Sequence, residues 1–465
     1  MSPYRIKNKR ISSPLSGFPF LRTRNKLPEK PRTSRQAVSE LGTRMRVSSR
    51  YAQTRMQNIL LTHGWRFFIF SLLMRLPASM VMLAVMMMLA YQNNEATLGG
   101  YAAGTVGISA AFMIPVYRRL SDRWGQHKIF FAVTVLNILA LVWLLLESLS
   151  FAEGTSGSIT RFLLAAALTG ITTVPLGTVM RSYWSAEYLK TKDRRKLNVS
   201  ISLETMLDVI ALPAGAVIAG LSTLVFNAQA TLFSVLIIDV LGLLMILWRP
   251  GSLPIERRDM VEGKPKPLRG GNRSLLWLPQ TGMICLGTVL GSTQAAIVAF
   301  ALSTDQISVT GFLIALLGLF AVASALFIIF ERLPAFTWVA WLLSGLGLTA
   351  ATLLLSLPSS LEWLVLALVL VGLSYGICLV VVDSVLTSLA ARSNLDLALS
   401  TMQACSLGGI AVGFVWAADL SESYNHQVAL LVPLIAAVFF FVLGHLYGFL
   451  WRSMYEERLA PLPQD

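Results

Sequence analysis

A small set of ionisable side chains lies inside long apolar segments, where a charge is costly to bury. Glu204 and Asp208 are four residues apart, a spacing that puts both carboxylates on one face of a helix. The others are Arg75, Arg181, Asp239, Asp383 and His445. Ionisable groups in a membrane-spanning helix usually mark a functional pathway or an ion pair. These residues are therefore the first candidates for chemistry, and the segments that carry them decide what they can do.

Those segments have the composition of a membrane protein. Of 465 residues, 55% are hydrophobic and only 13% are charged, whereas about a quarter are charged in soluble domains. Twelve apolar runs of about membrane-spanning length are present: 66–91, 98–116, 129–149, 161–183, 199–221, 229–248, 275–300, 309–331, 335–357, 361–388, 396–418 and 428–451. Because lipid offers no partner for backbone polar groups, each run is predicted to be a helix. The expected fold class is an all-α integral membrane protein with twelve transmembrane helices.

Lys and Arg in the connections predict the orientation. The six connections on one side are 92–97, 150–160, 222–228, 301–308, 358–360 and 419–427, and none contains a Lys or Arg. Arg161 lies at the border of that side, and the opposite connections are basic, from Arg118 and Arg119 in the first to Arg392 in the last. Basic connections stay in the cytoplasm. We therefore expect a multi-pass protein of the cell membrane with both termini in the cytoplasm.

The net charge of +14 comes mostly from residues 1–65, which contain fourteen Lys or Arg and two acidic residues. This composition predicts a largely disordered cytoplasmic tail rather than a nucleic-acid-binding fold, and no cleavable signal peptide is expected. The tail could be simply solvated, or it could contact anionic lipid headgroups. A third reading is that translation starts later, at Met45 or Met56, so that residues 1–44 are not made.

The remaining chain divides into two sets of six predicted helices, 66–248 and 275–451. The central loop 249–274 has linker chemistry, with Pro-Lys-Pro at 265–267, and a short cytoplasmic tail follows at 452–465. At an offset of 198 residues the fifth helix aligns with the eleventh, as in the matches Ser202 with Ser400 and Gly215 with Gly413. This alignment is consistent with a duplicated six-helix unit.

Glycines at helical spacing mark two faces, one with Gly100, Gly104 and Gly107 and one with Gly409 and Gly413. Small residues let helix backbones approach closely in lipid, either as static packing or as a surface on which two bundles slide. The three Cys and four His suggest neither a metal site nor a disulfide framework. A phosphate loop and an HExxH motif are both missing, so we expect neither an enzyme nor a cofactor.

The connection YRRLSDRWGQHK, residues 117–128, forms a charged, turn-forming island between two apolar runs. With the 6 + 6 arrangement, it resembles the signature loop of the major facilitator superfamily. The match rests on Leu120, Asp122, Arg123, Gly125 and Lys128. Arg118 stands where the family has Gly, and Gln126 and His127 stand where basic residues are usual. More narrowly, Arg75-Leu76-Pro77 and the segment 202–208 resemble actinobacterial efflux-type members, although Val209 replaces a customary acid.

The resemblance implies two pseudo-symmetric six-helix bundles. Asp122 would then face the positive end of the eleventh helix and hold the bundles together on the cytoplasmic side, with Arg123 and Lys128 as basic partners and Gly125 allowing the turn. Such a latch favours an outward-open state. The alternative is a charged loop that only fixes the topology.

The same resemblance places Arg75 and Arg181 near Glu204 and Asp208. These four residues would form a buried charge network that only neutralises itself, or one in which Glu204 or Asp208 binds a coupling proton. Asp239 is expected to be a structural partner more than a proton carrier. Asp383 is the cavity-helix acid of the second bundle, which could pair across a gate or contact a cationic substrate, and His445 is peripheral.

The expected function is secondary active transport by alternating access, as proton-coupled export of a small apolar or amphipathic compound. The alternatives are a proton symporter, a lipid-translocating facilitator, or a membrane scaffold or sensor that no longer transports. The expected partners are a small-molecule substrate, protons and the lipid bilayer, with no nucleic acid.

Overall fold

The structure is a computed structural model. It describes residues 65–124, 126–152, 159–173, 176–177, 180, 194–248, 275–330, 337–357, 360–390 and 395–459. These all belong to one compact unit, Thr54–Asp465. Residues 1–64 of the predicted tail 1–65 and the central loop 249–274 lie outside the described residues, as does Arg181.

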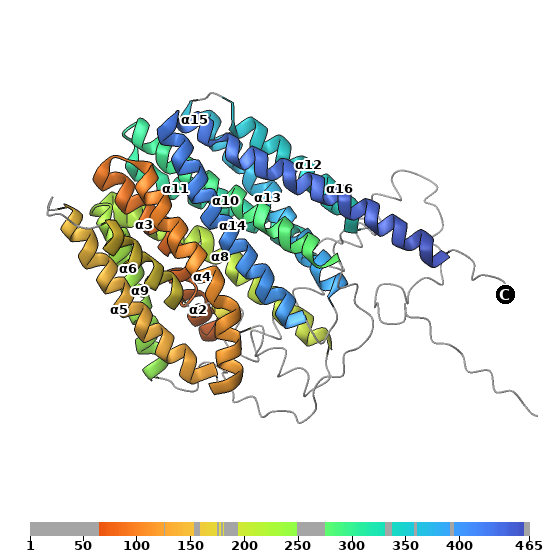
Figure 1. Cartoon of the computed structure of the whole chain (residues 1–465), viewed down its shortest axis with the longest axis horizontal. Coiled ribbons are helices and arrows are strands. Elements are labelled where there is room, and N and C mark those ends of the chain that lie inside the picture. The colour runs from red at the N-terminus through yellow and green to blue at the C-terminus, as the bar shows by residue number, and fades with distance from the viewer. Residues whose placement is uncertain are drawn as a thin grey trace, which may run out of the picture. The chain divides into compact units, whose positions relative to one another are not determined.

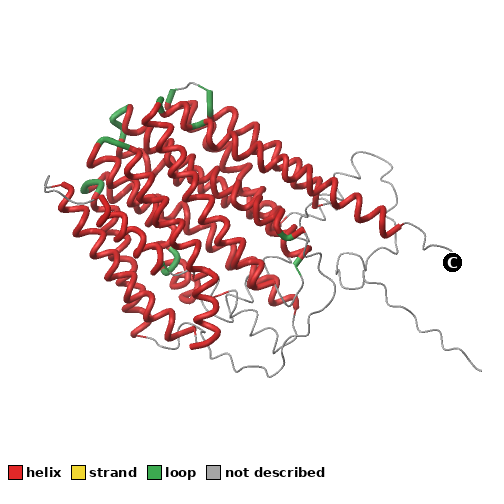
Figure 2. The backbone as a smooth tube through the Cα atoms, in the orientation of Figure 1, coloured by secondary structure: helices red, strands yellow, loops and turns green. Residues whose placement is uncertain are grey.

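Helices make up the regular structure of the described residues (Figures 1 and 2). The first set is α2 (Trp65–Leu73), α3 (Leu76–Asn93), α4 (Ala96–Trp124), α5 (Gln126–Ala152), α6 (Ile159–Thr172), α8 (Arg194–Val225) and α9 (Gln229–Trp248). The second set is α10 (Trp277–Ser303), η3 (Ile307–Val309), α11 (Thr310–Phe330), α12 (Thr337–Leu355), α13 (Leu361–Leu389), α14 (Leu395–Ser423), α15 (His426–Ala429) and α16 (Leu431–Leu459). The chain is thus all-helical where it is described.

Ten of the described helical segments are long and apolar enough to cross a membrane. Two shorter apolar helices, Ile159–Thr172 and Gln229–Met245, fall on the predicted fourth and sixth spans. The described residues therefore confirm a multi-pass membrane protein, while the count of twelve spans stays a prediction.

The first predicted span, 66–91, corresponds to one candidate membrane span, Phe68–Asn93, but its helix is not continuous. The structure divides it at Met74 and Arg75, between α2 and α3. Pro77 has no amide hydrogen, so it cannot donate the helical bond to the carbonyl of residue 73, and its ring disfavours a continuous helix there. The amide of Arg75 instead donates to the carbonyl of Leu72 over 3.0 Å. The break places Arg75 at the start of α3.

The prediction of a turn over residues 117–128 is also wrong in extent. Helix α4 continues to Trp124 and α5 begins at Gln126, so the charged residues lie on the ends of two helices. Outside the apolar core, Arg, Leu, Asp and Trp are all acceptable in a helix, and nothing stops α4 before Gly125. Gly125 itself lies outside the described residues.

The two ends of the helical unit differ in their connections. We call one the turn end, where short connections at 94–95, 226–228, 304–309 and 424–425 join the helices (Figure 2). The other is the basic end, where α4 and α5 carry Arg118, Arg119, Arg123 and Lys128.

Within the first set, α3 packs on α4, α8 and α9, and α5 packs on α6 and α9. Within the second, α10 packs on α14 and α16, and α13 packs on α11 and α12. The two sets meet mainly through α4 with α14 and α8 with α11 (Figure 1). This arrangement makes those two helix pairs the contact between the sets.

The glycine faces lie in close helix contacts. A Cβ added at Gly100 would stand 2.9 Å from the carbonyl oxygen of Phe414, and one at Gly107 would stand 2.8 Å from the Cβ of Ala411. A Cβ added at Gly413 would stand 2.6 Å from the amide nitrogen of Ser292. The small residues thus permit α14 to pack tightly against both α4 and α10.

Candidate functional site

A central cavity of about 240 Å³ lies between the two helix sets. Its wall is mostly Ala, Val, Leu, Ile and Met side chains. The larger polar and charged side chains in that wall are Arg75, Asp208, Gln294, Tyr375, Asp383 and Gln403. The cavity is therefore apolar with a few polar groups, the pattern of a site for a small molecule.

The cavity lies toward the basic end. Its lining includes residues 75–82 near the start of α3, 208–212 of α8, 375–383 of α13 and 399–410 of α14. Helices α8 and α14 begin at the basic end, α13 ends there, and the start of α3 is separated from that end by the short helix α2.

Arg75 connects α3 to α8 through a charge network. Its Nε donates to Asp208 Oδ1 over 2.6 Å, and its Nη2 donates to Glu204 Oε2. Its Nη1 donates to the carbonyl oxygen of Ser71 over 2.9 Å and also to the Ser71 hydroxyl. The helix break at Arg75 and the four-residue spacing in α8 together bring the guanidinium between the two carboxylates.

The network is buried on one side and reaches the cavity on the other. Arg75 is 4% exposed and Glu204 1% exposed, whereas Asp208 is 25% exposed. Arg75 and Asp208 line the cavity, and Glu204 lies behind them. The single guanidinium of Arg75 thus joins one carboxylate in the protein interior to one at the cavity wall.

Two smaller features hold Asp208 and α8 in place. A Cβ added at Gly177 would lie 2.6 and 2.8 Å from the two carboxylate oxygens of Asp208, so the absence of a side chain makes room for this acid. The Ser79 hydroxyl lies 2.9 Å from the carbonyl oxygen of Leu76 in α3 and 3.1 Å from the carbonyl oxygen of Ala211 in α8. Ser79 therefore links α3 to α8.

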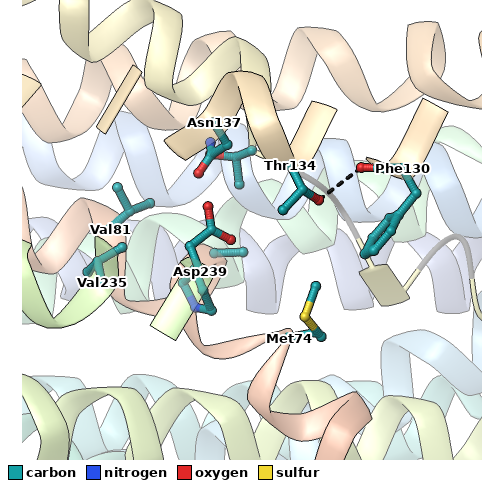
Figure 3. Close-up of a pocket in the computed structure, with 10 residues that line it drawn as sticks. Met74, Val81, Phe130, Thr134, Asn137, Val235 and Asp239 are labelled. Atoms are coloured by element: carbon teal, nitrogen blue, oxygen red, sulfur yellow. Dashed lines mark hydrogen bonds between the residues drawn. The ribbon is translucent and has the colours of Figure 1, made fainter. Parts of the chain in front are cut away.

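The other candidate residues are placed apart from this network. Asp239 of α9 lines a separate, small cavity in the first helix set (Figure 3). Asp383 is partly buried in the wall of the central cavity. His445 of α16 is exposed in the unit and does not line either cavity.

The expected gating residues are only partly described. Arg123 and Lys128 are exposed at the basic end. The side chain of Asp122 and the whole of Gly125 lie outside the described residues. Arg118 is half-buried, and its Nη1 is buried with no hydrogen-bond partner among the described residues.

At the turn end, polar contacts join the two helix sets. The Tyr91 hydroxyl of α3 lies 2.5 Å from that of Thr310 in α11. The Tyr101 hydroxyl of α4 donates to Asp419 of α14 over 3.0 Å.

A third contact involves Thr97 of α4, whose amide donates to Glu422 of α14 over 3.1 Å. Between α8 and α11 the backbones of Gly220 and Gly311 are in direct contact, since a Cβ at Gly220 would lie 3.1 Å from the Cα of Gly311. Together with the Tyr91 and Tyr101 contacts, these join the two helix sets at the turn end.

Sequence reasoning missed several of these residues. Gln294 and Gln403 interrupt apolar runs and could have been found by asking for uncharged polar side chains as well as ionisable ones. The turn-end partners Asp419 and Glu422 carried no such signal, because they lie at a helix end where acids are common on any membrane protein.

Comparisons with known proteins support a transporter fold. No protein-family model matches the sequence, and no curated protein sequence matches it. Among solved structures, the human organic anion transporter MFSD10 (TETRAN) superposes with a TM-score of 0.59 at 16% identity, covering 81% of this chain and 97% of that chain. The nucleoside transporter NupG superposes with a TM-score of 0.57 at 14% identity, covering 84% and 98%. The described part of this chain therefore shares the fold of these two solved transporters.

Proposed function

We propose that this protein is a secondary active transporter that works by alternating access and couples export of a small compound to proton entry. The single observation that carries this proposal is the Arg75–Glu204–Asp208 network at the wall of a central cavity between two helix sets. A buried carboxylate that reaches a cavity can be loaded and unloaded with a proton as access to that cavity changes.

The positions of Lys and Arg support a cytoplasmic location for the basic end. On this orientation the central cavity lies in the cytoplasmic half, and the contacts of Tyr91, Thr97 and Tyr101 close the opposite half. The structure then corresponds to an inward-facing state. Export requires these turn-end contacts to break while the basic end closes.

The latch at residues 117–128 belongs to that second step. In the proposed outward-facing state, Asp122 approaches the start of α14, with Arg123, Gly125 and Lys128 supporting the connection. The buried Nη1 of Arg118, which has no partner among the described residues, fits this proposal, because such an atom is suited to gain a partner in another state.

The lining of the cavity favours a neutral or cationic amphipathic substrate over an organic anion. Among the lining residues that the structure describes, Arg75 is the only cation, and each of its nitrogens already donates to Ser71, Glu204 or Asp208. The other charged groups in the wall, Asp208 and Asp383, are acids.

The test uses inverted membrane vesicles with a trapped pH-sensitive dye and an imposed acidic interior. A panel of neutral, cationic and anionic amphipathic compounds and nucleosides is added outside. We expect substrate-dependent loss of protons from the interior, and loss of this response in Glu204→Gln or Asp208→Asn.

The matched control is Glu362→Gln, which changes an exposed acid at the start of α13. It should couple substrate to protons as the unmodified protein does. Unchanged coupling in both network variants would exclude the proposed proton site, and no response to any compound would argue for a non-transporting scaffold.

A further inference from the structure

The small cavity around Asp239 is separate from the charge network and has an unusual set of polar atoms. It has a volume of about 20 Å³ and lies among α3, α5 and α9 and residue 173 after α6. Its polar lining consists of Asp239, Asn137, Thr134 and Thr173, and the remaining lining is apolar. A cavity of this size holds about one water molecule or one small ion.

Asp239 is only 7% exposed, and its Oδ2 is buried without a hydrogen-bond partner. None of the ten residues that line the cavity is Lys, Arg or His. Figure 3 shows the carboxylate directed toward Asn137. An isolated carboxylate at this burial is costly by several kcal/mol unless a cation or a proton neutralises it.

The neighbouring polar groups offer oxygen lone pairs and no free donor. Asn137 uses its Nδ2 to donate to the carbonyl oxygen of Thr169 over 3.1 Å and to the Thr172 hydroxyl over 3.0 Å. Because a carbonyl oxygen can only accept, this contact fixes the amide orientation. The polar atom that Asn137 has left for the cavity is its side-chain oxygen.

The hydroxyl protons of Thr134 and Thr173 are also used in hydrogen bonds to backbone carbonyl oxygens. The Thr134 hydroxyl donates to the carbonyl oxygen of Phe130 over 2.9 Å, and the Thr173 hydroxyl donates to that of Thr169 over 2.8 Å. Each hydroxyl has one proton, so only its lone pairs remain for the cavity. The cavity therefore joins one carboxylate to three neutral oxygens that can only accept.

We propose that this cavity is a binding site for a monovalent hard cation, Na⁺, ligated by the oxygens of Asp239, Asn137, Thr134 and Thr173. Hard cations select oxygen ligands, and one carboxylate with neutral oxygens balances a single positive charge. Among the described residues no group of three or more His, Cys, Asp or Glu could hold a metal ion, which sets this site apart from a transition-metal site. A proton would satisfy one of these acceptors, whereas a cation satisfies several together.

The proposed ion site lies next to the central cavity. Ala78, Val81 and Thr173 line both the small cavity and the central cavity. The bound cation would thus lie directly behind the wall of the central cavity, on the α3 side. Na⁺ binding can be measured without any transport substrate. Failure of the proposed Na⁺ site would therefore be distinguishable from failure of the proposed transport function.

The experiment measures thermal unfolding of the full-length protein in detergent at constant ionic strength, with Na⁺ exchanged for K⁺ or choline. We expect the melting temperature to rise with Na⁺ in a saturable way, and to rise much less with K⁺, which is larger than the cavity suits. Equilibrium binding of ²²Na⁺ to the same sample provides the second measurement. Constant ionic strength removes charge screening as a cause.

Two variants locate the ion. Asp239→Asn keeps the shape and removes the charge, and should abolish the Na⁺ response. Thr134→Val removes one ligand oxygen and should raise the half-saturating Na⁺ concentration about tenfold, which corresponds to about 1.4 kcal/mol. The matched control is Thr349→Val in α12, whose hydroxyl donates to the carbonyl of Gly345 over 2.9 Å in the same manner and should leave the response unchanged.

Several results would overturn the proposal. One is a melting temperature that does not respond to Na⁺, together with no ²²Na⁺ binding. Another is a response to pH alone that Asp239→Asn removes, which would identify a protonated carboxyl. A third is a Na⁺ response lost in Asp383→Asn and retained in Asp239→Asn, which would place the ion in the central cavity. If Asp239→Asn does not fold, an unchanged ²²Na⁺ affinity in Thr134→Val would also overturn the proposal.

Discussion

Replacing Arg75 by Leu tests the charge network most directly. The change places an apolar side chain at the position. It removes the cation that contacts both Glu204 and Asp208. Glu204 is 1% exposed, so its carboxylate is left deep in the protein without this cation. Removing one partner of a buried ion pair costs about 3–5 kcal/mol. We expect Arg75→Leu to lower the free energy of unfolding by that amount.

A double variant separates the charge effect from the loss of packing. Glu204→Leu alone should cost about 1.5–3 kcal/mol, because it removes a charged hydrogen bond from Arg75. In the Arg75→Leu background the same change removes the carboxylate that has already lost its contact with Arg75. The double variant should therefore be no less stable than Arg75→Leu alone, so that the two changes are non-additive by at least about 1.5–3 kcal/mol.

The assay is equilibrium unfolding in mixed micelles with increasing SDS, followed by native tryptophan fluorescence. Arg119→Leu is the matched control, since Arg119 is exposed on α4, and it should stay within about 0.5 kcal/mol of the unmodified protein. The reasoning is refuted if Arg75→Leu loses less than about 1 kcal/mol, or if the double variant loses the sum of the two single costs.

Three further substitutions probe packing around the sites. Gly177→Ala puts a Cβ 2.6 Å from a carboxylate oxygen of Asp208. We therefore expect substrate-dependent proton movement to fall while the melting temperature changes little. Proton movement equal to that of the unmodified protein would contradict this expectation. Gly311→Leu places a side chain against the backbone of α8, with its Cβ 2.7 Å from a carbonyl oxygen, and should cost about 1–3 kcal/mol and expose turn-end cysteine probes. Unchanged labelling would exclude a closed contact there. Trp341→Ala removes a fully buried indole whose nitrogen donates to the carbonyl of Phe440 over 3.2 Å, and should cost about 3–5 kcal/mol in the SDS assay, with Trp341→Phe losing less. Equal losses would contradict the packing argument.

The helical spans were predictable because lipid imposes one solution on a long apolar run. Once a segment such as 361–388 or 428–451 lies in the bilayer, only a helix satisfies its backbone internally, so composition and length suffice. The pairing of Glu204 with Asp208 on one face also follows from spacing alone. The break in the helix at Arg75 was harder to predict, although Pro77, which causes it, is visible in the sequence.

The contacts between helices could not be read in the same way. The separation of Asp239 from Asp208 into two cavities depends on which helices surround α9, and an apolar run gives no information on its neighbours. The turn-end contacts of Tyr91 and Tyr101 depend on which of two packings the helix sets adopt. On the proposed alternating-access mechanism the sequence must permit both packings, so it cannot indicate one of them.

The sequence by itself determined that this is an all-helical membrane protein and which ionisable groups lie inside its apolar segments, because hydropathy and helical period are local properties. Only the tertiary structure decided which of these groups meet. It turned the guanidinium of Arg75 toward Glu204 and Asp208, and it placed Asp239 in a separate cavity with Asn137 and Thr134. Those outcomes depend on how separate helices rotate and pack against one another, which is fixed by the shapes of many side chains at once.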